Sequence, residues 1–172
     1  LGGQCALDPL ATPLNDYQGL VGHLQELLAA TRQLNFAVVA DTQFAQANSD
    51  PRGAVVARMN VVDGIFSEQV GVHLNVSEIR LLTNNGSLTA TSPGTLLNQL
   101  SAFAGGSGFT NPGLTHLFTG RDLDGSVIGI AYLSSLCSAR FGVGLSETRG
   151  TGTAGALTVA HEVGHNFGAP HD

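Results

Sequence analysis

Apolar side chains recur every three or four residues in several stretches of the chain, which is the spacing that buries one face of an α-helix. The clearest stretch follows Asp50-Pro51, where Val55, Met59, Val62 and Phe66 mark an inward face. Proline just after a capping residue suits the first turn of a helix. We therefore predict an amphipathic helix over residues 16–33, helices that start at Asp50-Pro51 and Ser92-Pro93, and a last helix over about residues 153–167.

Short apolar runs lie between these helical stretches and indicate buried strands. The runs that we interpret as strands cover residues 35–40, 72–82, 114–119, 127–133 and 141–145. Strands that alternate with helices are typical of an α/β sandwich around a largely parallel sheet. The one candidate domain boundary lies near residue 34, where the first helix passes into the first strand.

The composition excludes several classes of protein. Hydrophobic residues make up 42% of the 172 residues and charged residues only 12%, so the chain is not intrinsically disordered. The formal net charge of −6, without a basic cluster, argues against nucleic acid and anionic lipid as partners. The longest apolar runs fall well short of the roughly 18 residues that a membrane-spanning helix needs. The absence of an initiator Met and of a signal peptide predicts a longer precursor.

The candidate chemistry lies in the last twelve residues, HEVGHNFGAPHD. His161 and His165 are four residues apart, so on a helix they share one face and can bind one metal ion. Gly168 can end that helix in the left-handed conformation, and the chain can then bring His171 back as a third ligand. Three imidazoles leave the fourth position of a zinc ion open for water, as in catalytic zinc sites. The other histidines, His23, His73 and His116, are interpreted as ordinary core or surface residues.

Glu162 is adjacent to the first of these ligands and can lie beside the metal without binding it. Zinc lowers the pKa of a bound water toward 7, and Glu162 can then accept the proton as a general base. The same carboxyl group can pass the proton to a leaving amine. The residues therefore predict peptide-bond hydrolysis by a zinc-activated water, without a covalent intermediate.

These residues resemble a known family. The sequence from His161 to Asp172 is similar to the extended zinc motif of the metzincin metallopeptidases, and Asp172 directly after the third histidine is typical of the adamalysin (reprolysin) branch. The resemblance continues in residues 116–147, HLFTGRDLDGSVIGIAYLSSLCSARFGVGLSE, and in residues 58–66, RMNVVDGIF. It covers about residues 35–172.

The resemblance implies a secreted or extracellular zinc endopeptidase that acts on a protein or peptide substrate. It implies a twisted, mainly parallel five-stranded sheet with an antiparallel edge strand, long helices and a C-terminal zinc-binding helix. His161, His165 and His171 would bind zinc, Glu162 would be the general base, and Asp172 would be a structural partner. The edge strand, Gly129, Ile130, Ala131 and Tyr132, would bind an extended substrate as an added antiparallel strand.

The same resemblance predicts what surrounds this domain. The family's Met-turn and lower subdomain follow the third histidine and are missing from this chain, so residues 35–172 would be a catalytic domain truncated after the zinc motif. Residues 1–34 would be a prosegment remnant or a linker. Cys137 matches a family cysteine whose usual partner would lie beyond residue 172. A bridge to Cys5, a free thiol, and a Cys5 thiolate that inhibits the zinc all remain open.

Two further functions compete with the peptidase. One is a metzincin-fold binding or adhesion module that does not cleave, or an inactive fragment of the peptidase. The other is a zinc hydrolase that acts on a non-peptide bond. The presence of Glu162 favours cleavage over binding alone, and a peptide-shaped edge strand favours a peptide substrate, so we favour the endopeptidase.

Overall fold

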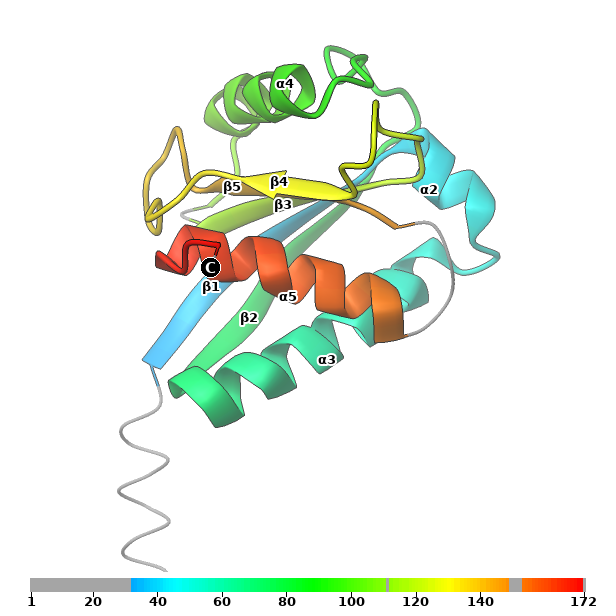
Figure 1. Cartoon of the computed structure of the whole chain (residues 1–172). Coiled ribbons are helices and arrows are strands. Elements are labelled where there is room, and N and C mark those ends of the chain that lie inside the picture. The colour runs from blue at the N-terminus through cyan, green and yellow to red at the C-terminus, as the bar shows by residue number, and fades with distance from the viewer. Residues whose placement is uncertain (1–31, 111, 149–152, 172) are drawn as a thin grey trace, which may run out of the picture. The chain divides into compact units, whose positions relative to one another are not determined.

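The computed structural model of the chain describes residues 32–110, 112–148 and 153–171. The boundary between the chain's two units falls between Arg32 and Gln33. Figure 1 shows a sheet with helices on both faces, and the elements have the following bounds in chain order. They are β1 Arg32–Ala40, α2 Thr42–Ala47, α3 Pro51–Val70, β2 Val72–Leu81, α4 Pro93–Gly106, β3 Leu114–Thr119, β4 Gly129–Ala131, β5 Val143–Glu147 and α5 Thr153–Phe167.

The sheet has five strands in the order β2-β1-β3-β5-β4. β3 runs parallel to both β1 and β5, with Val38 opposite His116 and His116 opposite Gly144. Contacts between β1 and β2 advance in the same direction along both strands, from Phe36–Ser77 to Ala40–Leu82, so this pair is parallel too. β4 is the antiparallel edge strand. The predicted sheet class and the predicted antiparallel edge strand are confirmed.

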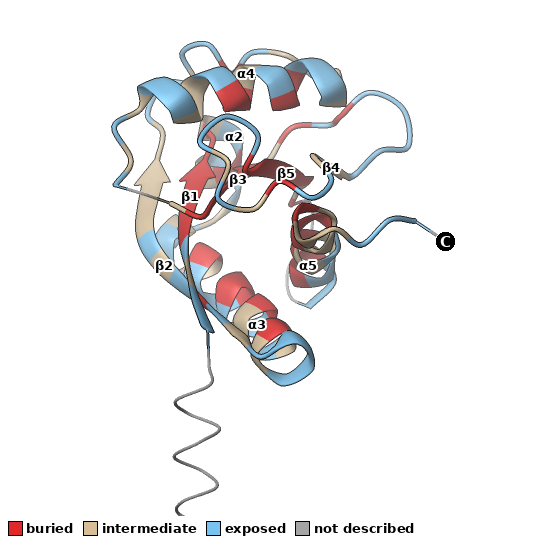
Figure 2. Cartoon of the chain, turned by 90° about the vertical axis from the view of Figure 1, so that its left-hand side faces the viewer, coloured by how far each residue is buried: buried red, intermediate tan, exposed pale blue. Residues whose placement is uncertain are grey.

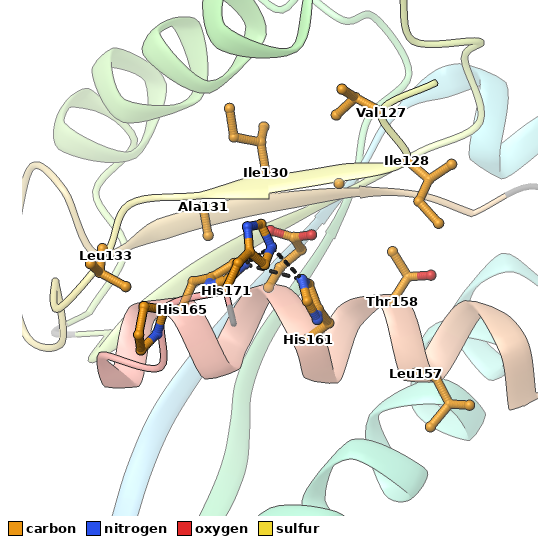
Figure 3. Close-up of a pocket in the computed structure, with 13 residues that line it drawn as sticks. Val127, Ile128, Ile130, Ala131, Leu133, Leu157, Thr158, His161, His165 and His171 are labelled. Atoms are coloured by element: carbon orange, nitrogen blue, oxygen red, sulfur yellow. Dashed lines mark hydrogen bonds between the residues drawn. The ribbon is translucent and has the colours of Figure 1, made fainter. Parts of the chain in front are cut away.

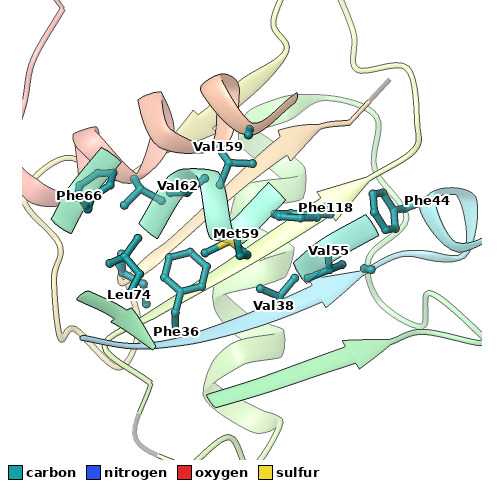
Figure 4. Close-up of a cluster of buried hydrophobic side chains, with 14 residues drawn as sticks. Phe36, Val38, Phe44, Val55, Met59, Val62, Phe66, Leu74, Phe118 and Val159 are labelled. Carbon is teal, nitrogen blue, oxygen red and sulfur yellow. The ribbon is translucent and has the colours of Figure 1, made fainter. Parts of the chain in front are cut away.

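Strand alternation sends successive residues to two separate apolar layers. On β1, Val38 packs with residues of α3 and α5, whereas Val39 packs with residues of α4. Figure 4 shows the first layer, which contains Met59 of α3 and Val159 of α5. Figure 2 shows that buried residues line the inner sides of the sheet and helices. One face of α5 therefore packs against the interior, and the opposite face is exposed to solvent. This packing fixes the helix that carries two of the candidate ligands.

The helices confirm most of the sequence pattern. Asp50 caps α3 by accepting a hydrogen bond from the Gly53 N–H, and its four predicted inward residues are all buried. α4 starts at Pro93 and α5 covers Thr153–Phe167, as predicted. α2 was not predicted. It has only six residues, and the buried side chain of Asp41 caps it by accepting from the Phe44 N–H.

Three predicted boundaries are wrong. The last strand was predicted over residues 141–145 but covers Val143–Glu147, the residues that pair with β3 and β4. Residues 32 and 33 were placed in the first helix but belong to β1, because pairing within a sheet overrides a helical pattern. The rest of that predicted helix lies outside the described residues. The edge strand was predicted over residues 127–133 but covers only Gly129–Ala131, the residues that are in register with β5.

Two general predictions concern the membrane and the thiols. Within the described ranges, no helix combines the length and the apolar character that crossing a bilayer requires. Cys137 carries a free, exposed thiol. Cys5, the possible partner or inhibitory ligand, lies outside the described residues.

Candidate metal centre and cleft

Three imidazole rings converge at the C-terminal end of α5. The Nε2 atoms of His161 and His165 are 3.1 Å apart, and each lies 3.0 Å from Nε2 of His171. His161 and His165 share a face because they are one helical turn apart. Gly168 then adopts φ +104°, as the sequence predicted, and the Ala169 N–H donates to the Gly164 carbonyl, which turns the chain back toward the helix. The structure thus brings all three predicted ligands together.

This nitrogen set fits a zinc ion. Two nitrogens bound to one zinc at about 2.0–2.1 Å and a tetrahedral angle are about 3.3 Å apart, close to the spacing observed here. Nδ1 of His165 lies 2.6 Å from the Ala169 carbonyl oxygen, so Nδ1 carries the proton and Nε2 keeps its lone pair. Burial lowers the pKa of His161, and positive charge on the two neighbouring rings would lower it further. The neutral form that binds metal is therefore favoured.

The Glu162 carboxyl group lies beside the rings and under the edge strand. The residue is buried, and a methyl group placed on Gly129 would be 2.5 Å from its Oε1. Burial raises the pKa of Glu162 to about 7, although positive charge on His165 acts in the opposite direction. A carboxyl group with this pKa can both accept and release a proton near neutral pH.

The histidine cluster and Glu162 line a cleft of about 710 Å³ between β4 and α5. Exposed aliphatic side chains stand at both ends of the cleft (Figure 3). Leu133 is 55% exposed at one end, and Ile128 and Leu157 are 56% and 53% exposed at the other. Exposed aliphatic side chains of this size around a polar centre are typical of a binding surface.

The edge strand offers alternate backbone groups to the cleft. The Glu147 N–H donates to the Ile128 carbonyl and the Tyr132 N–H lies 3.5 Å from the Val143 carbonyl. The alternation of an antiparallel ladder therefore directs the N–H and C=O of Ile130 to β5, and those of Gly129 and Ala131 to the open edge. Figure 3 shows the Ala131 side chain directed toward the histidines and that of Ile130 directed away.

Comparison with known proteins identifies the chain. The family described as "Metallo-peptidase family M12B Reprolysin-like" matches residues 53–172, and these residues include the whole cleft.

This chain belongs to the reprolysin-like metallopeptidase family.

Two relatives match over short segments. The chain is 47% identical over 57 residues to disintegrin and metalloproteinase domain-containing protein 19 of Mus musculus, and 40% identical over 57 residues to snake venom metalloproteinase Ac1 of Deinagkistrodon acutus. Each match covers 33% of this chain, but only 6% of the mouse protein and 28% of the snake protein. A solved structure described as a chaperone-substrate complex shares the fold alone, with a TM-score of 0.65 and 14% identity over 81% of this chain and 24% of that chain.

Asn166 supports this reprolysin-like site, although it was not predicted from the sequence. Its side chain is buried, because only 1% of the residue is exposed. Nδ2 is placed to donate to the Tyr132 carbonyl at 2.9 Å, to Ser135 Oγ at 2.9 Å and to the Val143 carbonyl at 3.1 Å. It follows Val159 and Val163 at helical spacing, so a polar residue on the inward face was the available signal.

The turn after the edge strand is also attached to the end of α5. The Ser134 and Ser135 N–H groups donate to the carbonyls of His165 and Asn166, at 2.9 and 3.0 Å. The last carbonyls of a helix have no partner within the helix, so these bonds both satisfy them and hold the turn in place. These bonds fix the distance between the edge strand and His165 in this reprolysin-like domain.

His116 is a core residue, in agreement with the prediction of an ordinary core or surface histidine. It is 1% exposed, Nε2 lies 2.9 Å from Ser146 Oγ, and its ring lies against those of Phe36 and Phe118. Burial lowers the pKa of His116 to about 3. His73 is exposed and contacts Asp63, and His23 lies outside the described residues.

Proposed function

We propose that this domain is a zinc endopeptidase in which His161, His165 and His171 hold the metal and Glu162 is the general base. The observation that carries the proposal is the convergence of three Nε2 atoms within 3.0–3.1 Å of one another. These are three of the donors that zinc prefers, and they form a group that can hold a metal ion. When bound, zinc would polarise the substrate carbonyl and lower the pKa of a water molecule.

Glu162 supplies the proton transfers. Its carboxylate accepts a proton from the attacking water, and the resulting carboxylic acid donates that proton to the amine of the leaving fragment. The raised pKa of about 7 suits both steps, because neither protonation state is strongly disfavoured at neutral pH. Contact with Gly129 holds the carboxyl group under the edge strand, where a substrate backbone would pass.

The edge strand binds the substrate backbone. The outward N–H and C=O groups of Gly129 and Ala131 pair with an extended peptide that runs antiparallel to β4. Ile130 and Tyr132 were also predicted to bind the substrate. They contribute side chains on the opposite face of the sheet and no backbone groups to this pairing. The substrate is therefore a protein or peptide in an extended conformation, whose C-terminal part lies toward Ile128 and Leu157.

We infer that residues 1–34 precede the catalytic domain as a prosegment or linker, and that the domain acts outside the cell. The boundary between Arg32 and Gln33 lies close to this division, although Arg32, Gln33 and Leu34 already belong to the first strand. A relative named as a snake venom metalloproteinase supports secretion.

The experiment that tests the proposal compares metal content with turnover. Plasma mass spectrometry should find one zinc per chain, and a quenched-fluorescence peptide library should be cleaved. Glu162→Gln should keep zinc and lose cleavage by about two orders of magnitude or more, whereas the exposed Glu68→Gln should change neither. Zinc without cleavage in the parent chain would indicate a binding module or an inactive fragment of the peptidase instead. Equal turnover in Glu162→Gln would exclude Glu162 as the base.

A further inference from the structure

A second pocket lies on the other face of the edge strand, outside the zinc cleft. It has a volume of about 620 Å³ and lies between α4 and the turn that follows β4. α4 contributes Asn98, Ser101, Ala102 and Gly105, and the turn contributes Tyr132, Ala139, Arg140 and Phe141. None of the steps proposed above uses this pocket.

The walls of the pocket are held by specific contacts. The Tyr132 hydroxyl donates to Asn98 Oδ1 at 2.7 Å, and the Tyr132 ring meets the Phe141 ring edge-on at 5.1 Å. Ser101 Oγ donates to the Arg140 carbonyl at 2.6 Å, which attaches the turn to α4. Preorganised walls reduce the cost of ordering side chains when a ligand binds.

The charge of the pocket is positive. Among the residues that the structure describes, Arg140 is the one basic residue that lines the pocket, and no acidic residue lines it. In the described part of the chain Arg80 pairs with Glu78 and Arg121 pairs with Asp41, but Arg140 forms no ion pair and only lies 5.3 Å from the Phe141 ring. A carboxylate that enters this pocket would therefore meet a cation that no acidic side chain of the described residues neutralises.

The register of the edge strand leads a substrate to this pocket. Tyr132 directly follows Ala131 and points its side chain toward α4. In an antiparallel pair, residues opposite one another place their side chains on the same face. The substrate residue opposite Tyr132 therefore presents its side chain to the pocket, and it is the third residue on the N-terminal side of the one opposite Gly129.

We propose that the pocket around Arg140 and Tyr132 is a specificity subsite for an acidic side chain of the substrate, on the N-terminal side of the cleaved bond. This proposal rests on the peptidase function proposed above. A substrate carboxylate pairs with the Arg140 guanidinium, and its methylene groups lie against the Tyr132 and Phe141 rings. An exposed pair of this kind changes binding by about two- to fivefold.

The test uses pairs of peptides that differ only by Glu or Gln at one position. The four positions before the cleaved bond are varied one at a time. At one position kcat/KM should favour Glu about two- to fivefold, and the preference should shrink as salt rises. Arg140→Gln should reduce the Glu-to-Gln ratio to about one, and Arg140→Lys should retain most of it. The matched control Arg52→Gln, at an exposed arginine of α3, should keep the parent ratio.

Peptide affinities from fluorescence anisotropy separate the two proposals. A Glu-to-Gln affinity ratio that depends on Arg140, in a chain that cleaves neither peptide, would overturn the peptidase function and leave the subsite. Cleavage of both peptides with no Glu preference at any position, or with a preference that Arg140→Gln does not alter, would overturn the subsite and leave the peptidase.

Discussion

The carboxyl group of Glu162 lies directly against Gly129, so that a single added methyl group at Gly129 would be 2.5 Å from Oε1 and 2.8 Å from Cγ. The edge strand and the zinc-motif helix therefore touch through the candidate base itself. Glycine is required here by space, not by backbone conformation. This contact links the position of the substrate strand to the position of the group that moves the proton.

Gly129→Ala should displace the Glu162 carboxyl group or push out the edge strand. A shift of about 1 Å in a catalytic group costs on the order of a hundredfold in rate, so kcat should fall about ten- to hundredfold. Zinc content should stay at the parent value, because the three histidines are untouched. The measurement is kcat on a library peptide, together with zinc stoichiometry.

Gly64→Ala provides the matched control for that change. An added methyl at Gly64, within α3, would meet no atom of the described residues within 4 Å apart from the neighbouring backbone of its own helix. Activity should be unchanged, and the free energy of unfolding should rise by about 0.5–1 kcal/mol because alanine favours a helix interior. A Gly129→Ala variant as active as Gly64→Ala would contradict the proposed contact.

Asn166→Asp replaces the buried amide with a carboxylate of the same shape that cannot donate. The carboxylate would face the carbonyl oxygens of Tyr132 and Val143, so the free energy of unfolding should fall by about 2–4 kcal/mol. The turn after the edge strand loses its side-chain bonds to α5 and keeps only the backbone bonds of Ser134 and Ser135. Because the edge strand is then held less firmly, KM should rise more than kcat falls. Asn60→Asp, at an exposed site on α3, is the control. A parent-like KM in a folded Asn166→Asp variant would refute the positioning role.

His116 should make folding stability depend on pH. Burial lowers its pKa from 6.5, the value expected in the unfolded chain, to about 3 in the folded state, so the unfolded chain binds the proton first. Stability is complete above pH 6.5 and falls as pH drops toward 3, by about 2 kcal/mol at pH 5 from this residue alone. Urea unfolding at about pH 5 and pH 7.5 measures the difference, and His116→Gln should reduce it. An unchanged difference in that variant would exclude His116 as the source.

Removal of the metal should destabilise the domain. A ligand that binds only the folded state stabilises it by about 2.7 kcal/mol when its concentration is about a hundred times Kd. A chelator should therefore lower Tm, and added zinc should restore it. Glu162→Gln should respond as the parent does, whereas His165→Asn should show little response. A chelator effect of equal size in His165→Asn would place the metal elsewhere.

The sequence predicted the zinc motif because its geometry is local. His161, His165 and Gly168 lie within about two turns of one helix, and helical periodicity alone determines that the two histidines share a face. The bounds of α5 were predicted for the same reason. Nothing beyond the helix and one glycine turn is needed to bring the three rings together.

Features that depend on distant contacts could not be predicted in this way. α2 exists because Asp41 caps it, and the same carboxylate also accepts bonds from Thr119 and Gly120, which are 78 and 79 residues away in the sequence. The length of β4 depends on its register with β5, and the fit of Gly129 to Glu162 depends on how a strand and a helix pack. The periodicity of neighbouring residues gives no information on these contacts between distant parts of the chain.

The central claim is that three imidazoles hold a single zinc ion in the cleft. Anomalous diffraction from crystals of the zinc-loaded chain, recorded on both sides of the zinc absorption edge, tests it most directly. We predict one peak, at about 2.0–2.1 Å from Nε2 of His161, His165 and His171. A zinc-loaded crystal with no peak among these rings, or with the peak on other side chains, would contradict the account.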